Sequence, residues 1–298
     1  MSQVLVEVSG MSKRYGRVTA LDNVAFSIRS GELLGLIGPN GAGKTTLFEC
    51  LAGVQPADHA QVLFQAEYRD TRRRSSVLFY VPDGIAPWPS QPVQRALEFS
   101  LDFLGGPRPL YKEVIADLSL GPLLRVPIGN LSKGQRKRAL LGLGLLSPQP
   151  VLLIDEPFEG LDLRQTREAT DALRKHVLTG RSLFVSIHQI SAAAKVCDRL
   201  VLLSEGRVVA QGTPDELTRL AAQKLGHTPP SDFEEVFLAL TGYSLVVAPS
   251  QRVFGINRLA RLVGDAGPHR TAGGRVVYRR HSHLCRSQRP GRRGGRAG

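Results

Sequence analysis

The chain has 298 residues, 42% of them hydrophobic, which is enough for one large or two small folded cores. No stretch approaches the roughly 20 apolar residues that span a bilayer, and the N-terminal sequence lacks the basic and apolar regions of a signal peptide. We therefore expect a globular cytoplasmic protein. The cysteines, Cys50, Cys197 and Cys285, are too few and too widely spaced for a disulfide framework, which predicts free thiols.

The positive charge of the chain is concentrated near its C-terminus. Residues 251–298 contain twelve arginines and a single acid, Asp265, so they carry +11 of the net charge of +13, and residues 1–250 carry only +2. Because the body is nearly neutral, we expect no specific nucleic-acid partner. The extension at 243–298 is rich in Gly, Arg, Ser and Pro, which predicts disorder and leaves anionic lipid as a partner for its arginines.

The N-terminal part of the chain predicts two antiparallel strands that lead into a buried parallel strand. The segments "VLVEVSG" and "LDNVAFSI", residues 4–10 and 21–28, alternate or nearly alternate apolar side chains. After the turn "RSGE", an apolar run from Leu33 to Ile37 is followed by a glycine-rich loop and then by a segment with helical spacing. The loop consists of Gly38, Pro39, Asn40, Gly41, Ala42, Gly43, Lys44, Thr45 and Thr46.

This loop has the pattern G-x-x-x-x-G-K-T between a strand and a helix, which is typical of nucleotide phosphate binding. Its glycines let successive backbone amides turn toward the phosphates, and the start of the following helix adds its positive end. Lys44 would bridge the β- and γ-phosphates, and the hydroxyl of Thr45 would bind Mg²⁺. The loop therefore predicts a nucleoside triphosphate and Mg²⁺ as ligands.

A second strand completes the predicted site. The apolar run "VLLI" at 151–154 ends in Asp155 and Glu156, which places both acids at the carboxyl edge of a parallel sheet, where α/β folds bind ligands. Asp155 is predicted to hold Mg²⁺. Glu156 is predicted to act as the general base that activates the attacking water.

Five motifs occur in a characteristic order: "GPNGAGKTT", "LSKGQ", "LLIDEP", "EGLD" and "SIHQ". Together they resemble the nucleotide-binding subunits of ATP-binding cassette (ABC) transporters over about residues 4–242. The resemblance and the predicted elements imply an α/β fold with a P-loop NTPase core, a mostly parallel sheet, an N-terminal antiparallel β subdomain and a small α-helical subdomain at about 85–146. We expect an ATPase domain at 1–242 that binds ATP and Mg²⁺, and an extension at 243–298.

The motif "LSKGQ" is expected to act on a phosphate that another subunit binds. Ser132 and Gln135 have the spacing of a capping box, and three cations follow at 136–138, near a positive helix end that disfavours them. These cations predict a nearby anion. In the family, two subunits pack head to tail, which implies that Ser132, Gly134 and Gln135 face the γ-phosphate held by a second copy or a homologous cassette.

The resemblance implies roles for three further residues. Tyr15 would stack on adenine, with a tyrosine serving only a buried or turn position as the alternative. Asp162, in "EGLD", would cross the dimer interface. His188, after the apolar segment "LFVSI", would contact the γ-phosphate as a catalytic switch, with an ordinary histidine at a strand end as the alternative.

Two positions depart from the family pattern. Asp83 follows "VLFYVP", where the family usually has a glutamine that touches Mg²⁺ and links the ATP site to the membrane subunit, and we predict Asp83 as a Mg²⁺ ligand. Lys133 stands where the signature usually has glycine; its side chain either attracts the opposing phosphate or points into solvent. A separate cluster, Arg72, Arg73 and Arg74, is predicted to be an exposed turn.

The segment before the signature motif is predicted to contain the helical subdomain. One helical face there contains the apolar positions Val93, Leu97, Leu101 and Leu104. In the family, this surface receives a coupling helix from the transmembrane subunit. Trp88 either takes part in that contact or packs among the prolines around it.

The combined interpretation is an ATP-hydrolysing subunit that dimerises head to tail and drives a separate transmembrane permease from the cytoplasmic face of the membrane. The segment "SDFEEVFLALTG" at 231–242 resembles the end of single-cassette subunits of bacterial drug and polysaccharide exporters, which favours export. The alternative is a cassette ATPase outside transport that serves as a regulatory or nucleic-acid-associated module. The cargo is recognised by the permease, so this sequence does not name it.

Overall fold

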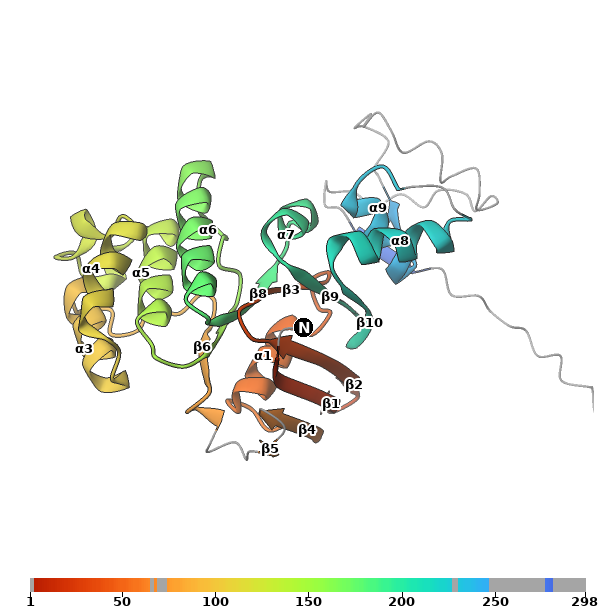
Figure 1. Cartoon of the computed structure of the whole chain (residues 1–298), viewed down its shortest axis with the longest axis horizontal. Coiled ribbons are helices and arrows are strands. Elements are labelled where there is room, and N and C mark those ends of the chain that lie inside the picture. Colours follow the sequence, from red (N-terminus) through yellow and green to blue (C-terminus); the bar gives the residue numbers. More distant parts are fainter. Residues whose placement is uncertain (1–2, 65–66, 69–73, 227–229, 247–276, 281–298) are drawn as a thin grey trace, which may run out of the picture. The chain divides into compact units, whose positions relative to one another are not determined.

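The computed structural model describes residues 3–64, 67–68, 74–226, 230–246 and 277–280. The chain divides into two units, Met1–Thr241 and Gly242–Gly298. Figure 1 shows their helices and strands. Within the described residues, no helix combines the length and the apolar character that crossing a bilayer requires.

The larger unit begins with a four-stranded antiparallel sheet in the order β2-β1-β4-β5. Its strands are β1 (Val4–Tyr15), β2 (Val18–Arg29), β4 (His59–Phe64) and β5 (Glu67–Tyr68). In β1, Val6 and Val8 are buried while Glu7 between them is exposed, and Val8 pairs with Phe26 of β2. This alternation places one face of the sheet on a core, which confirms the predicted antiparallel strands.

The second sheet of the larger unit has six strands in the order β10-β9-β3-β8-β7-β6. Strand β10 is antiparallel to β9, and the other neighbouring pairs are parallel. Buried apolar runs such as that of β3 are expected where a parallel sheet is covered on both faces. The strands are β3 (Leu33–Ile37), β6 (Leu78–Val81), β7 (Val151–Ile154), β8 (Ser182–Ile187), β9 (Arg199–Ser204) and β10 (Arg207–Gly212).

Two hydrophobic cores lie on the two faces of the six-stranded sheet. Leu34 of β3 belongs to the core shared with the four-stranded sheet and helix α1 (Lys44–Ala52). Ile37 belongs to the core formed with most of the other helices. Both described cysteines are buried free thiols, as predicted. Cys50 lies in the core shared with the four-stranded sheet, and Cys197 lies in the core formed with most of the other helices.

The helices between β6 and β8 group together at one end of the larger unit (Figure 1). They are α3 (Val93–Leu104), α4 (Arg108–Asp117), α5 (Lys133–Leu145) and α6 (Leu163–Leu178), with short 3₁₀ turns at Gly121–Leu123 and Ile128–Asn130. Helices α3, α4 and α5 contact one another, and α6 contacts α4 and α5. Val93, Leu97 and Leu101 are buried on α3, as the helical spacing predicts.

The remaining helices of this unit follow the last strands of the sheet. Strands β9 and β10 form the predicted hairpin. The helices are α7 (Ile190–Val196), α8 (Pro214–Lys224) and α9 (Phe233–Thr241). Both α8 and α7 contact α9, so α9 packs within the larger unit.

In the smaller unit, the structure describes two strands, β11 (Tyr243–Val246) and β12 (Val277–Arg280). They pair antiparallel, with Tyr243 opposite Arg280. The composition of the extension did not predict this pairing. Cys285 and most of this unit lie outside the described residues, so disorder of that part stays a prediction.

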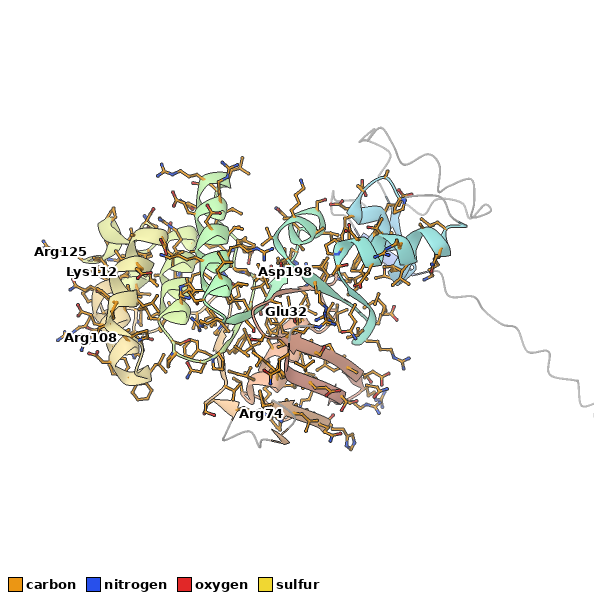
Figure 2. All side chains as sticks on the ribbon, viewed as in Figure 1. Glu32, Arg74, Arg108, Lys112, Arg125 and Asp198 are labelled. Carbon is orange, nitrogen blue, oxygen red and sulfur yellow. The ribbon has the colours of Figure 1, made fainter. Side chains whose placement is uncertain are left out.

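Arg74, which Figure 2 labels, is buried, and this corrects the prediction of an exposed turn at this position. Its guanidinium donates from Nη1 to the carbonyl oxygen of Cys50 at 3.0 Å. Cys50 lies in the last turn of α1, where a cation complements the negative end of the helix dipole. A run of arginines usually indicates side chains exposed to solvent. The sequence alone does not reveal that the end of α1 lies next to Arg74. Arg72 and Arg73 lie outside the described residues.

Candidate active site

Loops that follow four neighbouring strands of the six-stranded sheet form the candidate site. Because β3, β8, β7 and β6 are parallel, their carboxyl ends meet at one edge. Asp83 follows β6, Asp155 and Glu156 follow β7, His188 follows β8, and the phosphate loop follows β3. Residues from distant parts of the sequence therefore meet at this edge.

A pocket of ≈ 430 Å³ lies at this edge of the sheet. The predicted site residues that line it are Tyr15, Asn40, Gly41, Gly43, Lys44, Thr45, Thr46, Asp83, Asp155, Glu156 and His188. It is also lined by residues that the sequence did not single out, namely Val18, Thr19, Ala20 and Glu159. Predicted site residues outside this lining are Gly38, Pro39, Ala42, Ser132, Gly134, Gln135 and Asp162.

The phosphate loop is shaped by close backbone contacts at two glycines. At Gly43, φ is 102°, and a Cβ atom would lie 2.5 Å from the carbonyl oxygen of Ala20. At Gly38, a Cβ atom would lie 2.4 Å from the carbonyl oxygen of Leu203. Neither position has room for a side chain, so the loop has the bare backbone that a phosphate cradle requires.

Lys44 is buried at the start of α1. Its Nζ donates to the carbonyl oxygens of Gly38 at 2.8 Å and Pro39 at 3.3 Å. Burial lowers the pKa of Lys44, and the charges of Glu156 and Asp155 partly oppose this shift. An ammonium group has three protons, so Lys44 can keep both carbonyl contacts and donate to a phosphate.

Asp155 is held on both of its carboxylate oxygens. Oδ2 accepts a hydrogen bond from Oγ1 of Thr45 at 2.7 Å, and Oδ1 accepts one from Oγ of Ser186 at 2.5 Å. The hydroxyl of Thr45 and the carboxylate of Asp155 are thus adjacent at the pocket. Oxygen atoms of these two types are the ligands that Mg²⁺ prefers, so the donor set fits this ion.

Glu156 adopts a left-handed backbone conformation, with φ of 54°. Its N–H donates to Oγ of Ser186 at 2.9 Å, and its Oε1 lies 2.8 Å from Nε2 of His188. A left-handed conformation is costly for a residue with a side chain and persists only where its surroundings fix it. The serine hydroxyl and the histidine ring are two such contacts.

Ser186 contacts both the predicted metal ligand Asp155 and the predicted general base Glu156, and the sequence interpretation missed it. Its position in the apolar segment before His188 suggested a core strand. A polar residue inside a buried strand, two positions before a predicted site histidine, is the signal that points to it. Since the register of β7 and β8 pairs Ile154 with Val185, the residues that follow these partners, Asp155 and Ser186, lie side by side.

Tyr15 lies at the end of β1 with its ring half exposed at the pocket. Its hydroxyl donates to Oε1 of Gln55 at 2.6 Å, and Nζ of Lys13 lies 5.4 Å from the ring centroid. A buried tyrosine is thereby excluded, whereas stacking on adenine stays a prediction.

The predicted capping box at the start of α5 is present. The N–H of Gln135 donates to Oγ of Ser132 at 3.3 Å, and the N–H of Ser132 donates to Oε1 of Gln135 at 2.9 Å. Gly134 is buried, and a Cβ atom there would lie 2.6 Å from the carbonyl oxygen of Gly160. Asp162 caps α6 through a second capping box. These residues therefore shape the ends of two helices in their own chain.

The cations at 136–138 were expected to indicate an anion near the start of α5, and two of them have other partners within this chain. Lys137 is buried and pairs with Asp83. Arg138 donates from Nη1 to two carbonyl oxygens that follow α4, each at 3.2 Å. Both residues lie beyond the first helical turn, where the effect of the dipole has fallen off. An ion pair and hydrogen bonds with neighbouring elements therefore account for the charges of Lys137 and Arg138.

The two residues that depart from the family pattern also have partners. Nζ of Lys133 donates to Oε1 of Glu159 at 2.5 Å, a contact that neither predicted alternative included. At Asp83, burial opposes ionisation, but the hydrogen bond and charge of Lys137 outweigh it and lower the pKa of the carboxyl group. The role of Asp83 as a Mg²⁺ ligand stays a prediction.

Comparisons with known proteins agree with this site and fold. Residues 21–159 match the family model described as ABC transporter. The Nod factor export ATP-binding protein I of Ralstonia nicotianae is 31% identical over 222 residues, covering 72% of this chain and 69% of that protein. A sulfate/thiosulfate import ATP-binding protein of Brucella melitensis is 34% identical over 224 residues, covering 71% of this chain and 62% of that protein. This chain thus spans less than two thirds of the second relative.

Among solved structures, an ATP-binding subunit of an ABC transporter matches with a TM-score of 0.70 and 24% identity. The match covers 80% of this chain and 99% of that chain, which shows the shared fold. Fold and site together define a P-loop nucleotide-binding cassette. The chain belongs to the ABC transporter family and contains its ATP-binding domain. It is an ATPase, as the sequence predicted, because members of this family hydrolyse ATP.

Proposed function

We propose that this chain is the nucleotide-binding subunit of a transporter whose permease is a separate membrane protein. The observation that carries the proposal is the convergence of Lys44, Asp155, Glu156 and His188 on one pocket. In this role the subunit works at the cytoplasmic face of the membrane. ATP brings two cassettes together, and hydrolysis separates them to drive the permease.

The chemistry in the pocket is divided among a few side chains. Lys44 binds the β- and γ-phosphates, and Tyr15 stacks on adenine. Glu156 takes a proton from the water that attacks the γ-phosphate. His188, 2.8 Å from Oε1 of Glu156, orients this carboxylate and faces the γ-phosphate.

Mg²⁺ is the proposed metal, and Thr45 and Asp155 would hold it. When bound, it neutralises charge on the phosphates. Among the described residues, no group of three or more His, Cys, Asp or Glu side chains is placed to hold a metal. Phosphate oxygens and water would therefore supply the other ligands, as is usual for Mg²⁺. The third predicted ligand, Asp83, has its carboxylate engaged by Lys137.

Head-to-tail dimerisation is supported by the position of the signature residues. Ser132, Gly134 and Gln135 lie at the start of α5 and do not line the pocket of their own chain. A second cassette is the natural source of the phosphate they would meet. Asp162, at the start of α6, would cross the same interface.

Mixed dimers test this arrangement. Lys44→Ala removes the phosphate-loop lysine from one chain, and Ser132→Arg blocks the signature of the other, both in a Glu156→Gln background that stops turnover. In a head-to-tail dimer both defects fall in one site and leave the second intact. We expect mixed dimers to occlude about one ATP per dimer, and either homodimer to occlude almost none.

A site formed within each chain would give the opposite result. If each signature served the phosphate loop of its own chain, every site in the mixture would carry a defect. Mixed dimers that occlude no more ATP than the homodimers would then exclude a site shared between chains. Counting occluded ATP avoids the complication that turnover can require both sites.

An aromatic surface supports the proposed contact with the permease. The rings of Trp88 and Phe99 meet edge to face at 5.2 Å between centroids, and Phe99 stacks on Phe103 at 5.6 Å. All three side chains are exposed, which supports a docking role for Trp88 over packing among prolines. A coupling helix of the permease is the proposed partner.

Export is the proposed direction, because the segment at 231–242, which contains α9, resembles the end of exporter subunits. The two relatives described above are named for export and for import, respectively. Transport into inside-out vesicles separates the two directions. Cargo of an exporter accumulates inside such vesicles when ATP is added outside, whereas accumulation only in right-side-out vesicles would establish import.

A further inference from the structure

Helix α5 carries two lysines, each paired with a carboxylate that lines the ATP pocket. Lys133 pairs with Glu159, and Lys137 pairs with Asp83. Glu159 and Asp83 both belong to the pocket lining. Because residues four apart lie on the same face of a helix, one face of α5 is connected to the pocket wall at two points.

The two ion pairs differ in burial. The side chain of Lys137 is 4% exposed and that of Asp83 32%, whereas Lys133 is 60% and Glu159 41% exposed. Water screens an exposed pair, which therefore contributes little. A buried ammonium that loses its carboxylate remains charged without access to solvent, so breaking the inner pair has the larger consequence.

Lys137 contacts the pocket wall in two places. Besides the carboxylate of Asp83, which follows β6, its Nζ lies 3.4 Å from the backbone carbonyl oxygen of Asp155, which follows β7. One ammonium group therefore joins α5 to the ends of two neighbouring strands. The backbone of a predicted Mg²⁺ ligand is one of these contacts.

We propose that Lys137 and Asp83 form a positioning pair that fixes the signature helix to the wall of the ATP pocket. A displacement of α5 then moves the loop after β6 and the end of β7, and a change in the pocket moves α5. In this arrangement the carboxylate of Asp83 serves Lys137 rather than Mg²⁺. The inference requires only the ATP-binding site and does not depend on the proposed dimer or permease.

The test is a double-mutant cycle on the full chain with Asp83→Asn, Lys137→Gln and the double variant. The probe is the non-hydrolysable ATP analogue AMP-PNP, whose affinity is measured by calorimetry with Mg²⁺ and again in EDTA. Thermal unfolding without nucleotide is recorded for each variant. Comparison of the AMP-PNP affinities with Mg²⁺ and in EDTA separates a positioning role of Asp83 from a metal-ligand role.

We expect each single variant to weaken AMP-PNP binding about tenfold with and without Mg²⁺, and the double variant to weaken it by less than the product of the two losses. Asp83→Asn lowers the melting temperature more than Lys137→Gln, because it leaves a buried charge facing a neutral amide. The double variant recovers part of that loss, since neither charge remains.

Two results would overturn the proposal. Weakening by Asp83→Asn only in Mg²⁺, with no effect of Lys137→Gln, would make Asp83 a metal ligand. Unchanged AMP-PNP affinity despite lower melting temperatures would reduce the pair to a fold contact. Lys175→Gln is the matched control, because Lys175 pairs with Asp117 and Glu113 outside the pocket lining and its loss should leave AMP-PNP affinity unchanged.

Discussion

Around the pocket, Lys44, Asp155 and Glu156 are buried and each is held by hydrogen bonds or a histidine contact. On the outer side of α3, Phe99 and Phe103 are half exposed or more and stack on each other. The first region works by fixed geometry, because a phosphate and an attacking water must meet set atoms. In the proposed complex with a permease, the second would work by its apolar area, which water covers until the permease replaces it.

This difference predicts what a substitution does in each region. A change in the pocket alters chemistry while the fold survives. A change on the aromatic surface leaves the isolated ATPase intact and affects only assembly. Three experiments probe this contrast, beginning with the largest expected effect.

Removing the charge of the proposed general base should have the largest effect. We expect Glu156→Gln to lower ATP hydrolysis by a factor of about 10² or more, to retain ATP binding, and to accumulate a nucleotide-bound dimer. Phosphate release and gel filtration with ATP measure these outcomes. The control is Glu113→Gln on α4, where the same change lies in a surface ion pair. Turnover near that of the unmodified protein would remove Glu156 from this role.

Ser186→Ala is expected to have an intermediate effect. It removes the acceptor of the Glu156 N–H and the donor to Asp155, so the base loses the contact that holds its left-handed backbone. We expect kcat to fall about tenfold, from the loss of hydrogen bonds to charged groups, with little change in KM for ATP.

A second buried serine separates catalysis from stability. Ser147 donates to the carbonyl oxygen of Gly144 and accepts from Arg181, away from the pocket. Ser147→Ala should lower the melting temperature with kcat unchanged. If the two alanine variants lost stability equally and neither lost kcat, Ser186 would be a fold contact only.

The smallest effect on the isolated ATPase is expected at the aromatic surface. Phe103→Ser should leave kcat within about twofold of the unmodified protein, because Phe103 is 75% exposed and supports no core. Stimulation of the ATPase by the reconstituted permease should be lost. Leu178→Ser changes another highly exposed apolar residue, at the end of α6, and should preserve stimulation. Equal stimulation of both variants would place the permease contact elsewhere.

The sequence predicted the parts of the site that depend on local order along the chain. Gly38 to Thr46 form one contiguous segment that runs from the loop after β3 into the first turn of α1. Asp155 and Glu156 directly follow an apolar strand, so sequence spacing alone locates both parts of the site. The antiparallel start and the parallel sheet followed from alternation and from buried runs. These features are encoded by neighbouring residues.

The features that the sequence did not predict depend on contacts between distant segments. Ser186 faces the acids because of the register of β7 and β8, which no single segment specifies. Lys137 pairs with Asp83, which is 54 positions away in the sequence. Without that contact, the charge of Lys137 was interpreted as a sign of an anion at the helix start, and its partner in the pocket wall was not predicted. Predicting the burial of Arg74 likewise requires knowing where the end of α1 lies in the fold.

The capping box at the start of α5 uses only the acceptor side of the Ser132 hydroxyl. The N–H of Gln135 supplies the proton in that bond, so the hydrogen of the hydroxyl itself remains available to donate outward. Ser132 can therefore meet a phosphate without releasing its helix. The ordering entropy of this capping box is already lost when the monomer folds. Association of the two proposed cassettes would then cost chiefly rigid-body freedom. In the proposed head-to-tail dimer, the signature would be a preorganised surface, formed before the second cassette binds.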